Sequence, residues 1–344
     1  MERKQGKKLR VVFFSSTEFG VPTLSFLLKS GQYEVPLVVT RPAAPKGRKQ
    51  MVTPSPIASF LEAKHPEVET AAPERLAHND ELRERIRALK PDAFLLASYG
   101  LILPASFLQL TEHPLCLHPS PLPKLRGPSP IREALRLGWE KTAVCVFKMT
   151  RQLDAGPVLL CREQEIQPED DFGTLREKLA LLSAQCAYVA LRAVAAGTAQ
   201  YIPQDEAQAT YTRLLGPGDN HLDFRWDARR VVNFVRAMAP EPGAACVDPL
   251  GRRMKVLRAS MRPQRIPGSS PGLVIGLYRH TIEIAAGDDN AVFLHEVQPE
   301  GGRVMSVADY LAGHRIILGD EFTSLPREEP VRGPDRSGIP PGTG

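Results

Sequence analysis

Apolar runs and helical patterns alternate along the first 200 residues. Leu9–Phe14 (LRVVFF) is a short run of apolar and β-branched residues, which is typical of a buried strand. After a small polar turn, apolar residues recur at helical spacing over 21–28. The same alternation predicts further strands over 35–40, 93–98, 115–118 and 143–149, and helices over 57–64, 80–90 and 172–195.

Strands and helices that alternate at this spacing favour one sheet, mostly parallel, with helices on both faces. The first part of the chain is therefore predicted to be an α/β domain of the Rossmann-like type. In such sheets the ligand crevice lies beyond the carboxyl ends of the strands. We therefore expect the chemistry just after Ser98, His118 and Met149.

The pattern changes after residue 200. Residues 201–220 are irregular and contain Pro203, Gly216, Pro217 and Gly218, which suits a linker. Asp227 can cap a helix, and short β-like runs separated by Gly and Pro follow over 244–297, which predicts a small, OB-like β-barrel. The expected segments are a flexible basic N-terminus (1–8), the α/β domain (9–200), the linker (201–220), the β-barrel domain (221–322) and a disordered tail (323–344).

The composition fits a globular protein. Among 344 residues, 44 Lys and Arg against 39 Asp and Glu leave a net charge of +5, too small to indicate a partner. No run approaches the roughly 18 apolar residues that cross a bilayer, and the N-terminus has no apolar signal core, so we expect a cytoplasmic protein with no membrane partner. The five cysteines are widely spaced without a CxxC pair, so we expect neither a disulfide framework nor a structural zinc.

Candidate chemistry lies in two motifs. Residues 117–130 (LHPSPLPKLRGPSP) place His118 at a strand end, before prolines that stiffen the loop. Residues 153–160 (LDAGPVLL) place Asp154 in a tight turn, where a carboxylate could act as a base or orient His118. A structural Pro-rich turn and an Asp that only closes a turn explain the same residues, and spacing alone leaves both interpretations open.

These motifs, with the early FSSTEFGVPTL, resemble the folate-dependent formyltransferase family, and within it the methionyl-tRNA formyltransferases. The resemblance extends from about Leu9 to Phe322. It implies a formyltransferase catalytic domain followed by a tRNA-facing domain. It also implies 10-formyltetrahydrofolate as the formyl donor and the α-amine of methionyl initiator tRNA as the acceptor, with no metal.

The resemblance also assigns site residues. His118 would polarise the formyl group or stabilise the tetrahedral intermediate, and Asp154 would orient His118 and relay the proton that the amine loses. The folate loop would comprise Ser120, Pro121, Leu122 and Pro123, and the slot for the pterin ring would comprise Tyr99, Leu101, Ile102 and Leu103.

Cys116 is a departure from the family pattern, which has asparagine two residues before the histidine to help bind the formyl oxygen. A thiol is a weak donor, and loss of one such donor typically lowers turnover about a hundredfold to a thousandfold. Three interpretations stay open: an active enzyme that uses a water or backbone donor, a slow enzyme, or a binding protein. We favour an active, altered enzyme, in which Cys116→Asn raises the turnover number. The plainer alternative is that Cys116 only fills a buried strand position, as free cysteines often do.

Two acid-free basic segments suit contacts with phosphates. The first contains Arg41, Lys46, Arg48 and Lys49, and in the family this loop inserts near the acceptor end of the initiator tRNA. The second contains Arg252, Arg253, Lys255, Arg258, Arg262 and Arg265. Basic loops also occur as plain solvated surface. We expect a monomer that formylates methionyl initiator tRNA. The alternatives are a formyltransferase for a small amine and a catalytically weak folate- or tRNA-binding homologue.

Overall fold

The computed structural model describes residues 8–46, 51–262 and 267–325. The chain divides between Leu214 and Leu215 into two compact units, which are described separately. Of the expected terminal segments, 1–8 and 323–344, only residue 8 and residues 323–325 are described, and Thr323–Ser324 form a short strand in place of the start of the expected tail.

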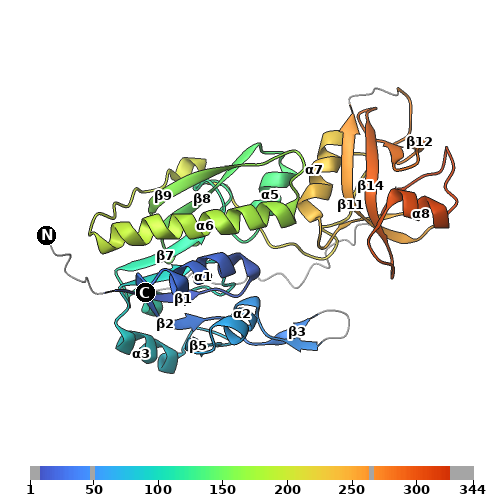
Figure 1. The fold of residues 1–344 in the computed structure, drawn as a ribbon. Helices are drawn as coiled ribbons and strands as arrows, with labels where there is room; N and C mark the ends of the chain where they lie inside the picture. Colours follow the sequence, from blue (N-terminus) through green and yellow to red (C-terminus); the bar gives the residue numbers. More distant parts are fainter. Residues whose placement is uncertain (1–7, 47–50, 263–266, 326–344) are drawn as a thin grey trace, which may run out of the picture. The chain divides into compact units, whose positions relative to one another are not determined.

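The first unit contains the predicted alternation of strands and helices (Figure 1). Its elements are β1 (Leu9–Phe14), α1 (Val21–Lys29), β2 (Tyr33–Val39), β3 (Ala44–Lys46), β4 (Met51–Thr53), α2 (Pro56–Lys64), β5 (Thr70–Ala71), α3 (Asp80–Leu89), β6 (Ala93–Leu96), α4 (Ala105–Leu108), β7 (His113–His118), α5 (Pro130–Arg136), β8 (Lys141–Lys148), β9 (Val158–Glu165) and α6 (Phe172–Ala195). Two 3₁₀ turns, Glu18–Gly20 and Glu206–Gln208, complete it.

The main sheet has the strand order β5-β2-β1-β6-β7-β8-β9. Strands β5, β2, β1, β6 and β7 are parallel, whereas β8 is antiparallel to both β7 and β9. The Rossmann-like expectation is confirmed, with an antiparallel edge that the strand pattern did not predict. Because β8 is antiparallel to β7, Met149 lies beside Pro114 at the amino end of β7. The Met149 N–H donates to the Pro114 carbonyl oxygen, with an N···O distance of 2.7 Å.

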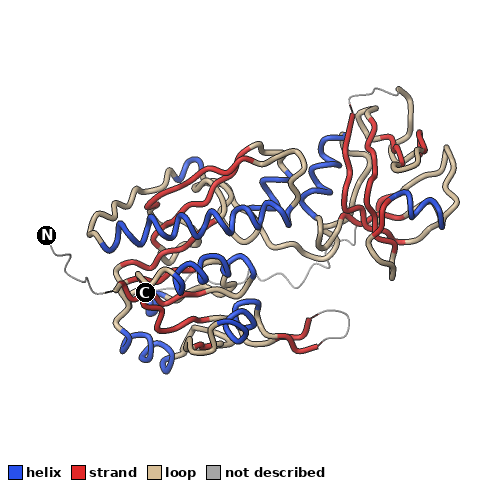
Figure 2. The backbone as a smooth tube through the Cα atoms, viewed as in Figure 1, coloured by secondary structure: helices blue, strands red, loops and turns tan. Residues whose placement is uncertain are grey.

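Helices cover both faces of this sheet (Figures 1 and 2). On one face, Leu82 and Ile86 of α3 join a buried cluster with Val12, Phe14 and Phe94. Helices α1 and α6 pack against each other, and α6 also packs against β8 and β9. The alternation of side chains along β1 gives each face its own core.

Helix α6 begins at a capping box. The Asp171 side chain accepts from the Thr174 backbone N–H, and the Thr174 hydroxyl oxygen accepts from the Asp171 backbone N–H. Its 24 residues are long and apolar enough to pass for a membrane span by length and composition. The sheet provides the partner for its apolar face, which includes Leu175, Leu179 and Leu191. This is the pattern of a core helix.

The second unit is a curled antiparallel sheet with two helices packed on it. Its elements are α7 (Ala228–Met238), β10 (Ala244–Val247), β11 (Arg253–Arg262), β12 (Val274–Leu277), β13 (Ile282–Ala285), β14 (Ala291–Pro299), β15 (Met305–Ser306), α8 (Val307–Gly313) and β16 (Thr323–Ser324). Asp227 caps α7 as predicted, because its side chain accepts from the Arg230 backbone N–H.

One short segment joins the two edges of this sheet. The strand order is β12-β13-β14-β11-β10-β16, with β15 beside β14. Val274 N–H, at the β12 edge, donates to Asp320 O, while Thr323 and Ser324 of β16 pair with β10. The segment 320–324 therefore bridges from β12 to β10, which gives the barrel-like closure expected from the sequence.

Candidate active site

Strand β7 positions the first two candidate side chains. Its residues 114–118 are all buried, and Cys116 and His118 share one face because side chains alternate along a strand. His118 is only 5% exposed. A ring that is buried to this extent keeps one orientation when its nitrogens have fixed partners.

The loop after β7 provides one of those partners. The backbone at Leu125 adopts a left-handed conformation (φ 56°), and its carbonyl oxygen lies 3.0 Å from His118 Nε2. A carbonyl oxygen only accepts, so this contact requires the proton on Nε2. In the neutral ring the other nitrogen, Nδ1, therefore carries no proton and can accept a hydrogen bond.

Asp154 lies on the Nδ1 side of the ring. Its Oδ2 is 3.6 Å from His118 Nδ1 and accepts from the Gly127 backbone N–H at 2.7 Å. The first distance is too long for a direct hydrogen bond but suits an ion pair or a bridging water. Both side chains are nearly buried, at 7% and 12% exposure, so water screens their interaction weakly.

The route by which Asp154 reaches His118 differs from the one predicted. Met149 directly follows β8 and lies at the amino end of β7, about 13 Å from His118 along a strand that rises roughly 3.3 Å per residue. The loop 150–157 folds back, and Asp154 itself is left-handed (φ 50°). Gly156 is required in that loop because a Cβ there would lie 1.7 Å from the Lys148 carbonyl oxygen.

Cys116 is a buried free thiol. Burial raises its pKa well above the ordinary value, and the negative charge of Asp154 raises it further. The thiol is therefore protonated and uncharged near neutral pH, which makes it a weak hydrogen-bond donor and an unreactive nucleophile.

The residues expected to receive the pterin ring lie just after β6. Tyr99 is buried in the core cluster, with its ring edge-on to Phe14, and burial raises its pKa to about 12. Its hydroxyl has no hydrogen-bond partner among the described residues. Leu103 is buried, Leu101 is partly buried and packs against the same cluster, and Ile102 is 75% exposed.

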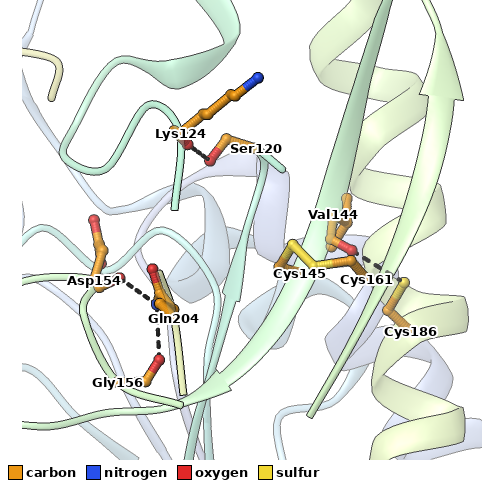
Figure 3. Close-up of a disulfide and its surroundings, with 9 residues drawn as sticks. All are labelled: Ser120, Lys124, Val144, Cys145, Asp154, Gly156, Cys161, Cys186 and Gln204. Atoms are coloured by element: carbon orange, nitrogen blue, oxygen red, sulfur yellow. Dashed lines mark hydrogen bonds between the residues drawn. A yellow bond between two sulfur atoms is a disulfide. The ribbon is translucent and has the colours of Figure 1, made fainter. Parts of the chain in front are cut away.

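A hydrogen bond between its own residues stabilises the expected folate loop. Ser120 is buried and its hydroxyl donates to the Lys124 carbonyl oxygen at 2.7 Å (Figure 3). Pro121, Leu122 and Pro123 are partly exposed. The hydroxyl of Ser120 thus closes the loop on itself, and the three apolar side chains form its accessible part.

Only part of the first basic segment is described. Arg41 is exposed and its Nη1 donates to the Gly100 carbonyl oxygen at 3.4 Å, which brings it beside the expected pterin slot. Lys46 ends β3, which pairs with β4 in a hairpin, and Arg48 and Lys49 lie outside the described residues. In the second segment, the Arg252 guanidinium is held by Asp248.

The cysteine prediction was wrong in one respect. Cys145 and Cys161 form a disulfide (Figure 3). Strands β8 and β9 are antiparallel, and their register places the two residues directly opposite each other, with Cα atoms 4.0 Å apart. A sequence separation of 16 does not reveal such a pair, because strand register is set by the sheet. Cys116, Cys186 and Cys246 are free.

Gln204 and Glu206 also contact the site's loops, although sequence reasoning assigned them only to a linker. Gln204 donates to the carbonyl oxygens of Asp154 and Gly156, and Glu206 pairs with Arg126 (Figure 3 shows the Gln204 contacts). These contacts join residues 48 to 80 positions apart. No local pattern signals Gln204 or Glu206, whereas their partners Arg126, Asp154 and Gly156 lie within the two recognised motifs.

Known proteins resemble this chain over most of its length. Residues 8–191 match the formyl transferase family, and residues 215–315 match the formyl transferase C-terminal domain. A methionyl-tRNA formyltransferase of Bacillus velezensis is 34% identical over 312 residues, which cover 90% of this chain and 96% of that protein. Another, of Heliobacterium modesticaldum, is 34% identical over 327 residues and covers 91% and 100%.

Solved structures share the fold at lower identity. The N-formyltransferase of Helicobacter canadensis, solved with folinic acid and dTDP-3-aminofucose, matches with a TM-score of 0.63 at 14% identity, over 83% of this chain and 98% of that one. HypX of Aquifex aeolicus, solved with tetrahydrofolic acid, matches with a TM-score of 0.57 at 19% identity, over 89% and 47%. From the matches to both halves and the relatives above 30% identity, the chain belongs to the methionyl-tRNA formyltransferase family of formyl transferases.

Proposed function

We propose that this protein transfers the formyl group of 10-formyltetrahydrofolate to the α-amine of methionyl initiator tRNA, for translation initiation. The observation that supports this best is the pairing of His118 with Asp154. Leu125 O holds one side of the imidazole, and Gly127 N–H holds the carboxylate on the other. Formyl transfer to an amine needs such a pair, because charge develops on the formyl oxygen while the amine loses a proton.

His118 acts through Nδ1. When the amine nitrogen attacks the formyl carbon, the new N–C bond forms and the carbonyl electron pair moves to oxygen. A proton on Nδ1 then stabilises that oxygen by a charge-assisted hydrogen bond. The Leu125 carbonyl keeps Nε2 protonated throughout, so the ring presents Nδ1 to the reaction at every stage.

Asp154 acts as the base for the amine proton. It accepts one proton from the attacking amine through a water, and the amine nitrogen becomes neutral. Collapse of the tetrahedral intermediate restores the carbonyl bond and breaks the bond to the folate nitrogen, which takes from Asp154, through the water, the proton that the amine lost. The proton count therefore balances, and His118 and Asp154 end in the states in which they began.

For the formyl donor, we propose the slot of Tyr99, Leu101, Ile102 and Leu103 together with the loop of Ser120, Pro121, Leu122 and Pro123. The residues present fit a flat heterocycle. The Tyr99 hydroxyl is buried and has no hydrogen-bond partner in the part of the chain that the structure describes, and Leu101 and Leu103 pack in the same apolar cluster as Tyr99. Apolar walls with a few converging polar groups are usual for such ligands.

For the tRNA, we propose phosphate contacts from the first basic segment, with Arg41, Lys46, Arg48 and Lys49. Only Arg41 and the backbone of Lys46 are described, and Arg41 lies beside Gly100 of the donor slot. A tRNA end bound there would bring its aminoacyl group near the donor. We also propose that the protein acts in the cytoplasm as a monomer.

Formylation of a small amine and binding without transfer are not favoured, because the methionyl-tRNA formyltransferases match nearly their whole length. One competition assay separates these functions. The purified protein receives 10-formyltetrahydrofolate with methionyl initiator tRNA and an amino sugar together. We expect formyl-methionyl-tRNA as the product. Preferential formylation of the sugar, or no product despite folate binding, would overturn the proposal.

A further inference from the structure

Three consecutive residues hold both proposed catalytic groups. The carbonyl of Leu125 accepts from His118, and the N–H of Gly127 donates to Asp154. The residue between them, Arg126, is fully buried. The orientation of the two peptide groups that flank Arg126 therefore sets the relative placement of His118 and Asp154.

The guanidinium of Arg126 is saturated by a segment that lies about 80 residues away in sequence. Nε and Nη2 donate to Gln204 Oε1 at 3.1 and 2.8 Å, and Nη1 and Nη2 donate to the Glu206 carboxylate at 2.8 and 2.7 Å. Nη1 also donates to the Tyr211 hydroxyl at 3.1 Å. All five donors of an arginine are thereby used, so Arg126 has none left for a substrate.

Gln204 connects this arginine to the Asp154 loop. While its amide oxygen accepts from Arg126, its amide nitrogen donates to the carbonyl oxygens of Asp154 and Gly156, at 2.9 and 2.7 Å (Figure 3). The single side chain therefore links the loop that holds His118 with the loop that supplies Asp154. No hydrogen-bonding group of the Gln204 amide is left over.

Backbone contacts fix the same segment in place. Arg126 N–H donates to Thr210 O, and Thr212 N–H donates to Arg126 O. The Thr210 hydroxyl accepts from Leu125 N–H at 2.9 Å. Leu125 and Asp154 both have left-handed backbones, which non-glycine residues keep only where their surroundings hold them.

We propose that Gln204 is a positioning residue, which acts with Arg126 to set the distance and orientation between His118 and Asp154. This inference rests on the proposed formyl transfer. Side chains that fix reacting groups typically contribute through geometry, and a displacement of about 1 Å can lower the rate about a hundredfold. Gln204 should therefore affect the chemical step and not the binding of substrates.

The test compares Gln204→Leu with Gln208→Leu. Gln208 lies on the same segment, and its amide donates to the side chain of Asp205 and to no other residue among those described, so it serves as the matched control. We expect Gln204→Leu to lower kcat by about tenfold to a hundredfold. Its KM values for donor and tRNA should stay within about threefold of the parent, and the pH profile of kcat should shift. Gln208→Leu should leave all of these unchanged.

A purely structural role would lower the melting temperature without moving kcat per folded molecule or the pH profile, and that result would overturn the inference. If Gln204→Leu does not fold, Gln204→Glu gives the answer, because it keeps the acceptor for Arg126 and loses the donor to Asp154 O and Gly156 O. A parental kcat in that variant also overturns it. If the parent itself transfers no formyl group, the proposed function fails first, and this inference with it.

Discussion

At the scale of single residues, we propose that Cys116 affects how the formyl oxygen is held. Its thiol shares a face of β7 with His118, and burial and the charge of Asp154 raise its pKa so that it stays neutral. We expect Cys116→Asn to raise kcat by about tenfold or more, because the amide adds a stronger donor beside the reacting oxygen. Steady-state kinetics of the purified variant measure this.

Cys116→Ala is the matched control, since it removes the thiol without adding an amide. Its kcat should stay within about threefold of the parent. If the Asn variant is no faster than the Ala variant, a missing donor does not limit turnover in this enzyme, and His118 with water or a backbone group suffices.

Gly127 provides a second residue-level prediction. Its φ is +104°, and a Cβ there would lie 2.6 Å from the Thr212 carbonyl oxygen. We expect Gly127→Ala to lower the free energy of unfolding by about 2 kcal/mol and to lower kcat, because its N–H must leave the Asp154 carboxylate. Urea unfolding and kinetics measure the two effects.

Gly31→Ala is the control that separates the cost of backbone strain from the cost of the clash with Thr212. Gly31 also has a positive φ (+66°), but nothing lies within 4 Å of its Cβ position. It should show only the smaller loss from backbone strain and full activity. Equal losses of stability in the two variants, with parental kcat in Gly127→Ala, would contradict the role given to the Gly127 N–H.

The sequence was enough to nominate His118 and Asp154, because each lies in a motif with a local signal: a strand end before prolines and a tight Asp-Ala-Gly-Pro turn. The structure brings them within 3.6 Å of each other. Gln204 had no such signal. Its role depends on contacts across about 80 residues, which only the folded chain creates.

At the scale of elements, β5 and β9 of the first sheet were not predicted, whereas the positions of β1, β2, β6, β7 and β8 follow directly from the apolar runs. Their directions do not, because a strand run in either direction has the same side-chain alternation. The antiparallel β8 and β9 therefore escaped prediction, and with them the opposition of Cys145 and Cys161. Asp154 was found by its motif, although it reaches His118 by a folded-back loop and not from the carboxyl end of a parallel strand.

In the second unit, Asp248 ties the turn before β11 to α8. Its side chain is 1% exposed and accepts from the Arg252 guanidinium and from the Tyr310 hydroxyl, at 2.7 Å in each case. Burial alone would raise its pKa, but these donors and the Arg252 backbone N–H outweigh burial and lower it. The folded state therefore favours the ionised carboxylate.

The lowered pKa of Asp248 determines how the stability of this unit depends on pH. A group whose folded pKa lies below its unfolded pKa stabilises the fold above the unfolded value, about 4, and the stabilisation is lost as the pH falls through the folded pKa. We expect Asp248→Asn to lower the free energy of unfolding of this unit by about 2 kcal/mol or more at pH 7, with a smaller difference from the parent in acid.

Urea unfolding read by Trp226 fluorescence, in a Trp139→Phe background, reports on the second unit alone. Asp309→Asn makes the same change at an exposed carboxylate of α8 and should have little effect at either pH. A pH-independent difference between Asp248→Asn and the parent would contradict the proposed contribution of the ionised carboxylate.

At the scale of the whole molecule, the small net charge of +5 does not show that basic residues cluster in two acid-free segments. In the second, Arg252 serves the fold through Asp248, which a count of basic residues could not reveal. Arg41 is exposed beside Gly100. We expect Arg41→Ala to raise KM for tRNA several-fold and to reduce the slope of log KM against log salt by about one, because one phosphate contact is lost.

Lys29→Ala, at the exposed end of α1, removes the same charge elsewhere on the first unit. It should leave the tRNA KM and the salt slope unchanged. If the two variants respond alike, net charge and not a local contact governs the affinity for tRNA.

The family and both domain classes were predictable from the sequence, because motif residues and strand patterns are local. That residues 201–214 cluster with the first unit was not predictable from composition, since an irregular Pro- and Gly-containing segment looks the same whether it is docked or free. Here it is docked, through the backbone pairing of Thr210 and Thr212 with Arg126.

The most direct test of the central claim is a single-turnover assay of formyl transfer. The purified protein, in excess over methionyl initiator tRNA, receives 10-formyltetrahydrofolate, and formyl-methionyl-tRNA is measured over time. We predict product from the parent, and rates lower by at least about a hundredfold in His118→Asn and Asp154→Asn. A parent that forms no product, or variants that form it at the parental rate, would contradict the account.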